Sequence, residues 1–217
     1  MKKRLSALMC IILVLSMLLA LTGCSGGDKA KLVGKWKCEK DVAEVINRGI
    51  AIGDENIAEY VSIDEFKIVV YMEFNENDTF SMYADPASLD AAMDDMKEDL
   101  IEGLSKYMED MIFEQTGLSL PVEEILELAG MTMDDLLAEI VTDDLVDEMV
   151  SEIASEGKFK AEDGKLHTSA GLQYEVDPAV YETYTLEGDK LTLLEYVGDD
   201  ADANDALVYP MVFVKIG

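Results

Sequence analysis

The pattern of hydrophobic and polar positions divides the chain into two strand-like ends and a helical middle. Near both ends, apolar residues alternate with polar ones, as they do in strands with one buried face. Between residues 86 and 156 the apolar spacing changes to three or four, the period of an amphipathic helix. The pattern therefore predicts a β domain that is interrupted by a helical segment.

The first predicted strand is Leu32–Cys38. Its apolar residues share one face with Trp36, the single tryptophan, and two lysines occupy the other face. Phe66–Phe74 alternates in the same way and is predicted to form a hairpin with Thr79–Tyr83 across a polar turn. These segments predict an antiparallel start to the sheet.

The C-terminal part of the chain predicts further strands, several of them joined by turns that contain glycine. They are Lys158–Ala161, Lys165–Thr168, Leu172–Val176, Tyr181–Leu186, Lys190–Val197 and Leu207–Ile216. Consecutive strands with short connections are typical of an antiparallel meander or barrel. The predicted fold class is α+β: an antiparallel barrel of about eight strands with a helical insertion at 86–156.

The insertion is predicted to hold three helices. They are 86–117 with Asp85 as cap, 121–129 ending at Gly130, and one that runs from a capping box at Thr132 to Gly157. Two shorter helices are expected within 41–60, with breaks at Gly49 and Gly53. The insertion is interpreted as part of one domain, because both ends of the chain read as strands.

The start of the chain has a composition of its own. Three basic residues precede Leu5–Leu21, an uncharged apolar run of roughly 25 Å as a helix, slightly short of a membrane span. This order is typical of a signal peptide. One alternative is an uncleaved membrane helix. The other is an ordinary signal peptide that is followed by chance by a cysteine, Cys24.

The four residues Leu21-Thr22-Gly23-Cys24 resemble the lipobox of bacterial lipoproteins. The resemblance implies cleavage before Cys24 and a diacylglycerol anchor on its thiol. It implies an extracytoplasmic protein held at the cell membrane, in a bacterium whose signal style is that of Gram-positive species. The expected organisation is a signal peptide at 1–23, a flexible tether at 24–30 and a domain at 31–217.

The Leu-x-Gly-x-Trp pattern at 32–36 resembles the first strand of lipocalin-like domains. In that family the tryptophan closes one end of an up-and-down barrel, and a basic residue near the last strand packs over it; Lys215 has that position here. Residues 74–80 resemble the second hairpin, although Asp78 stands where the family has glycine. The resemblance implies a lipocalin-like barrel that holds a small apolar ligand. The expected lining residues are Trp36, Phe66, Ile68, Val70 and Phe80.

Charge narrows the choice of partners. The chain has 46 acidic and 17 basic residues, and three of the basic residues lie in the signal peptide, which leaves a net charge of −32 after cleavage. Such a surface excludes nucleic acid and anionic lipid as electrostatic partners and favours cations or basic proteins. Solubility in a crowded cell envelope also explains it.

Motifs for catalysis are missing from the sequence. It has no Gly-x-Ser-x-Gly, His-Glu-x-x-His, Cys-x-x-Cys or phosphate loop, so we predict neither an enzyme nor a cofactor. The single histidine, His167, is expected to be exposed on a hairpin. After loss of the signal and lipidation of Cys24, only Cys38 remains, and an internal disulfide is impossible.

One acidic loop places oxygen ligands at alternate positions, as a calcium loop begins. The candidate ligands are Asp199, Asp200, Asp202 and Asn204. The loop departs from the EF-hand at its sixth and twelfth positions, and a solvated acidic turn is the alternative.

The insertion combines acidic residues with seven methionines between Met93 and Met149. A methionine-rich acidic groove suits a basic amphipathic partner, and filling of gaps between the insertion and the barrel is the alternative. The sequence thus predicts a lipid-anchored envelope protein with two candidate roles. One is to bind a small apolar ligand in the barrel, and the other is to recruit a basic protein or cations through the helices.

Overall fold

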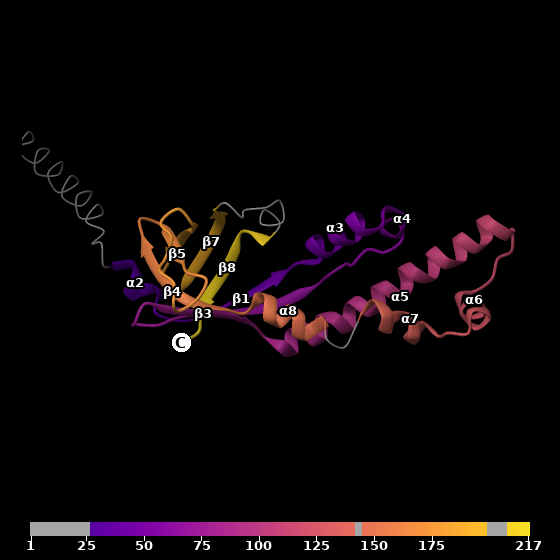
Figure 1. Cartoon of the computed structure of the whole chain (residues 1–217), viewed down its shortest axis with the longest axis horizontal. Coiled ribbons are helices and arrows are strands. Elements are labelled where there is room, and N and C mark those ends of the chain that lie inside the picture. Colours follow the sequence, from indigo (N-terminus) through magenta and orange to yellow (C-terminus); the bar gives the residue numbers. More distant parts are fainter. Residues whose placement is uncertain (1–26, 142–144, 199–207) are drawn as a thin grey trace, which may run out of the picture.

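The molecule is elongated, with the strands at one end and most of the helices toward the other (Figure 1). The computed structural model describes residues 27–141, 145–198 and 208–217. The barrel contains all of the strands in these ranges, and helices α3 to α8 project from one end of it as an arm. We call these six helices the helical arm.

The barrel is closed, and its strands follow one another in chain order, each antiparallel to the next, with β8 beside β1. The strands are β1 (Gly34–Asp41), β2 (Lys67–Phe74), β3 (Thr79–Ala84), β4 (Ser155–Glu162), β5 (Lys165–Thr168), β6 (Tyr181–Glu187), β7 (Lys190–Val197) and β8 (Met211–Lys215). The predicted fold class, an α+β antiparallel barrel with a helical insertion, is confirmed.

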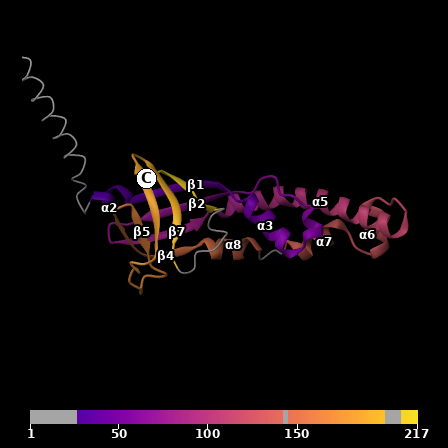
Figure 2. The ribbon, with the colours of Figure 1, turned by 90° about the horizontal axis from the view of Figure 1, so that it is seen from above.

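In chain order, the helices are α2 (Gly27–Leu32), α3 (Ala43–Gly53), α4 (Glu55–Ala58), α5 (Pro86–Thr116), α6 (Val122–Ala129), α7 (Met133–Ile140) and α8 (Leu145–Ile153). The long helix α5 runs outward from the barrel, and α7 and α8 lie along the return path (Figures 1 and 2). In the described ranges, no helix is both long and apolar enough to cross a membrane.

The barrel interior is filled by the alternating apolar residues of its strands. Every second residue of β2 from Ile68 to Phe74 is buried. Phe74 packs against Phe159 of β4 with ring centroids 4.8 Å apart. The predicted alternation in Phe66–Phe74 is therefore the pattern that the core requires.

One end of the barrel is closed around the tryptophan. The indole Nε1 of Trp36 donates a hydrogen bond of 2.6 Å to the carbonyl of Leu32 in α2. Lys215 Nζ lies 5.1 Å from the Trp36 ring centroid, in the position that the lipocalin-like resemblance implies. Gly34 has φ +128°, and a Cβ there would lie 2.5 Å from the carbonyl oxygen of Gly217. The two ends of the described chain therefore meet closely at this position.

The helix boundaries differ from the predictions in several places. Residues 27–30, expected in the tether, belong to α2. The third helix of the insertion is two helices, because α7 ends at Ile140, and Val141 has φ −111° and ψ 88°. Asp85 makes no side-chain cap, and its backbone carbonyl accepts the first helical hydrogen bonds instead. Gly49 does not break α3, which continues through it.

Gly157 was expected to stop a helix, but it lies inside strand β4. A Cβ at this position would be 2.2 Å from the carbonyl oxygen of Ser169. The glycine is required by this close approach of two backbones rather than by a helix end.

The expected strand Leu172–Val176 is a loop of turns. Leu172 and Tyr174 are exposed, so this segment has no buried face to support a strand. The residues that follow it contact His167, whose Nδ1 lies 3.0 Å from the carbonyl oxygen of Val180 and 3.3 Å from that of Asp177. The predicted exposed histidine is therefore wrong, because His167 is buried.

Candidate functional site: a groove on the helical arm

The turns of the helical arm are set by glycines and by a capping box. Gly117 and Gly130 have left-handed backbone conformations and end α5 and α6. Thr132 then opens α7: its hydroxyl accepts a hydrogen bond from Asp135 N, and Asp135 Oδ2 accepts one from Thr132 N. The sequence predicted these three features, and they place α6 and α7 beside α5.

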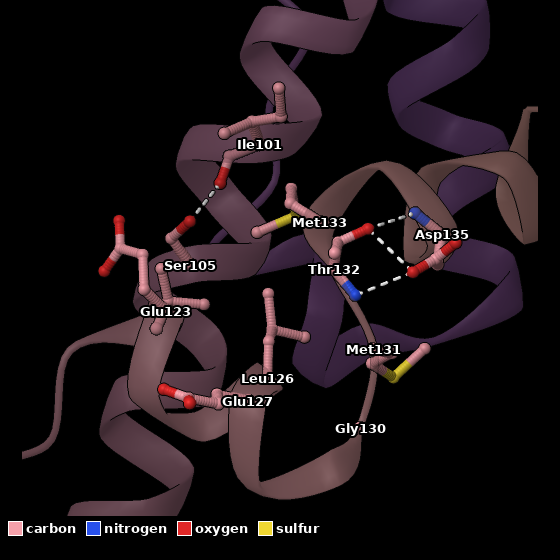
Figure 3. Close-up of a pocket in the computed structure, with 11 residues that line it drawn as sticks. Ile101, Ser105, Glu123, Leu126, Glu127, Gly130, Met131, Thr132, Met133 and Asp135 are labelled. Carbon is pink, nitrogen blue, oxygen red and sulfur yellow. Dashed lines mark hydrogen bonds between the residues drawn. The ribbon is translucent and has the colours of Figure 1, made fainter.

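A groove of about 490 Å³ lies where these three helices meet. Ile101, Leu126 and Met133 all line it, and Figure 3 shows Leu126 pointing toward Met133. Ile101 comes from α5, Leu126 from α6 and Met133 from α7, so the groove has an apolar floor built by three elements.

Carboxylates line the edge of the groove. Glu123 and Glu127 stand one turn apart on α6, and Asp135 stands on α7. Hydrogen bonds from Thr132 lower the pKa of Asp135, so this carboxyl is ionised at neutral pH. The groove thus offers an apolar surface edged by negative charge.

The helical segment around the groove is also negatively charged. Residues 86–156 contain 21 acidic and two basic residues. The two lysines of this segment pair with carboxylates one turn away on α5: Lys97 Nζ is 3.1 Å from Asp94 Oδ1, and Lys106 Nζ is 2.5 Å from Glu102 Oε1. Most of the acidic groups on the helical arm therefore have no lysine of the arm beside them.

The structure divides the predicted methionine cluster between two roles. Met93 and Met96 are buried in the core, which supports the gap-filling interpretation for them. Met131 and Met133 are half-buried and line the groove, which supports the binding interpretation for these two. Binding of a basic amphipathic partner by this second pair stays a prediction.

The residues predicted to line a ligand cavity are all in the core. Trp36 and Phe66 are fully buried, and Ile68, Val70 and Phe80 are nearly so. Their side chains pack with those of the neighbouring strands in one apolar cluster. The small apolar ligand stays a prediction. The remaining predicted site residues, Cys24, Asp199, Asp200, Asp202 and Asn204, lie outside the described residues.

Sequence reasoning identified the acidic, methionine-rich character of the helices but missed the residues that form the groove. Ile101 and Leu126 are ordinary members of amphipathic helices, and no motif marks them. The available signal was the run Gly130-Met131-Thr132-Met133, which places two methionine side chains around a forced turn.

Comparisons of the chain with family models, with curated proteins and with solved structures found no match.

Proposed function

We propose that this is a lipid-anchored cell-envelope protein whose helical arm binds a basic amphipathic segment of another protein. The observation that carries the proposal is the groove, which combines an apolar floor with three carboxylates at its edge. A helix with lysine or arginine residues beside an apolar face is complementary to it in both respects. The lipid on Cys24 would keep the arm at the outer surface of the membrane.

Shape and charge favour a segment of a protein over a small apolar molecule in this groove. Ile101 is 38% exposed and the edge carboxylates are exposed, so the groove is an open channel on the surface. An amphipathic helix buries such a channel along its length and keeps its charged side chains in water. Methionines adapt to varied apolar side chains, which suits this kind of recognition.

The test is a binding titration with a synthetic amphipathic helix of leucine and lysine residues. The protein is isolated from its own membranes, and its intact mass first establishes whether the chain begins at a diacylglycerol-modified Cys24. Glu123→Lys together with Glu127→Lys reverses the charge at the edge of the groove, and we expect affinity to fall at least about tenfold. Met131→Ser is expected to weaken binding without a change in charge.

The matched control is Glu148→Lys with Glu152→Lys on α8. These residues are exposed, have the same spacing, and do not line the groove, so the net charge of the protein changes equally. We expect less than about a threefold change in affinity. If both double variants weaken binding equally, the peptide is attracted to the acidic arm in general and the groove is not the site.

A further inference from the structure

A second concave site lies where α4 and the residues after it pack against α5. It is a pocket of about 320 Å³ whose lining is Asn56, Glu59, Tyr60, Tyr107, Met111 and Glu114. Ser105 lines the groove and Tyr107 lines this pocket, and at about 100° per residue the two lie on nearly opposite sides of α5. The pocket is therefore separate from the groove.

Two tyrosine rings form adjoining walls of the pocket. The rings of Tyr60 and Tyr107 meet edge to face, with centroids 5.5 Å apart and planes at 65°. Their close approach depends on Gly103, because a Cβ there would lie 2.7 Å from the Tyr60 carbonyl oxygen and from a methyl group of Val61. The chain after α4 can lie directly on α5 only at a residue without a side chain.

The charges that face these rings are negative. Glu59 and Glu114 line the pocket, and a hydrogen bond to the Asp110 carboxylate raises the pKa of Tyr60. The phenol of Tyr60 therefore stays neutral, and its ring gains electron density from a negatively charged acceptor. Among the described lysines, Lys106 lies in the neighbouring hollow on the far side of Tyr60, where it is paired with Glu102. No basic residue lines the pocket itself.

We propose that this pocket binds a quaternary ammonium group. Such a group is attracted to the faces of aromatic rings and to nearby carboxylates, and it has no N–H that must be satisfied. Met111 adds a soft, polarisable contact for the methyl groups of the cation. A primary ammonium is strongly hydrated and would lose more hydration energy than it gains from contact with the two rings.

The experiment is a titration of the full chain, in a maltoside detergent that carries no ammonium group, with choline. The methyl signals of ¹³C-methyl methionine are followed by nuclear magnetic resonance, and the Met111 signal is identified with Met111→Leu. We expect a saturable shift of the Met111 signal and a loss of affinity of about tenfold in Tyr107→Leu. Glu114→Gln, at an exposed position that leaves the packing intact, is expected to weaken binding about threefold.

Two further ligands test whether the pocket recognises the charge of choline and its methylated ammonium group. The neutral isostere 3,3-dimethylbutanol has the same shape without the charge, and Nα-acetyllysine amide presents a primary ammonium as a protein side chain does. Both are expected to bind at least about tenfold more weakly than choline. Equal binding of the neutral isostere, tighter binding of the lysine derivative, or no saturable shift would each overturn the proposal.

The groove provides an internal control. Glu123→Lys with Glu127→Lys is expected to weaken peptide binding in the groove at least about tenfold and to leave the choline shift unchanged, because those residues do not line the pocket. A choline shift that disappears in this variant, or one that persists in Tyr107→Leu, would show that choline is not held by the two tyrosines.

Discussion

The barrel and the helical arm are stabilised in different ways. The chain leaves the barrel for the arm twice, after β1 and after β3, and returns each time. Each strand of the barrel is bonded to two neighbours, and β8 closes the ring on β1. The arm has no comparable closure. Its buried residues on α5 end at Leu104, one turn short of Met108, and α8 has no fully buried residue. Val122, Ile125 and Leu126 of α6 are buried, so the arm is packed in separate patches rather than around one closed core.

This difference explains where the candidate binding surfaces are found. Helices of eight or nine residues, such as α6, α7 and α8, are marginal on their own and depend on caps and on contacts with α5. Loosely packed regions expose grooves and adjust to partners, while closed barrels resist change. In this molecule the groove and the pocket both lie on the arm, and the barrel acts as the fixed base that holds it.

The largest expected effect is on the barrel. Trp36→Ala removes a fully buried ring and its hydrogen bond to Leu32, and we expect a loss of about 3–5 kcal/mol in the free energy of unfolding. The control is Phe113→Ala near the tip of α5, where the ring is 55% exposed, with an expected change within about 0.5 kcal/mol. Urea unfolding measures both. A Trp36→Ala cost below about 1 kcal/mol would contradict the central role of this end of the barrel.

A buried carboxyl group makes the stability of the barrel depend on pH. Glu182 of β6 stands opposite Leu166, which is fully buried, so its side chain points into the barrel. Its Oε2 atom is shielded from solvent and has no hydrogen-bond partner among the described residues. Burial raises the pKa of Glu182 from 4.5 to about 7. The folded state therefore binds this proton more tightly than the unfolded state.

The direction of the pH dependence follows from the raised pKa of Glu182 in the folded state. Between about pH 4.5 and pH 7 the unfolded chain releases the proton first, so the free energy of unfolding falls as pH rises, by about 3 kcal/mol from this group. In Glu182→Gln, this part of the pH dependence of the free energy of unfolding is expected to disappear. The exposed Glu187→Gln on the same strand is the control, because it keeps the pH dependence that comes from the overall negative charge. Parallel curves for wild type and Glu182→Gln would contradict the prediction.

The sequence predicted the barrel better than the site because alternation is a local signal and a groove is not. The strands Lys165–Thr168 and Lys190–Val197 have the predicted bounds. In the second of these, the buried Leu191 and Leu193 alternate with less buried residues. The run at 172–176 has strand-like residues but lies on the surface as turns, with Leu172 and Tyr174 exposed. Periodicity cannot distinguish these two cases.

The residues of the candidate sites were harder to predict for a related reason. Helix ends at Gly117, Gly130 and Thr132 follow from local backbone chemistry and were predicted correctly. The contact between Tyr60 and Tyr107 joins residues that are far apart in the chain, and nothing in the sequence relates them. Sites made by the approach of separate helices become visible only when the packing is known.

A single glycine controls how tightly the arm is assembled. In Gly103→Ala the new methyl group would lie 2.7 Å from the Tyr60 carbonyl oxygen and from a methyl group of Val61, so the chain after α4 must move away from α5. We expect a loss of about 2 kcal/mol in stability, confined to the arm. Hydrogen exchange, which reports local opening, is expected to speed up in α4 and α5 and to stay unchanged in the barrel strands.

Gly49→Ala is the matched control, because Gly49 lies in α3 and a Cβ there meets nothing within 4 Å. Alanine is the better helix former, so this variant is expected to gain about 0.5–1 kcal/mol. The comparison separates a packing clash from the general effect of alanine in a helix. If Gly103→Ala also slowed exchange in the arm, α5 and the chain after α4 would not be in close contact. If it speeded exchange equally in the barrel, the arm and the barrel would unfold as one unit, and the contrast between them would fail.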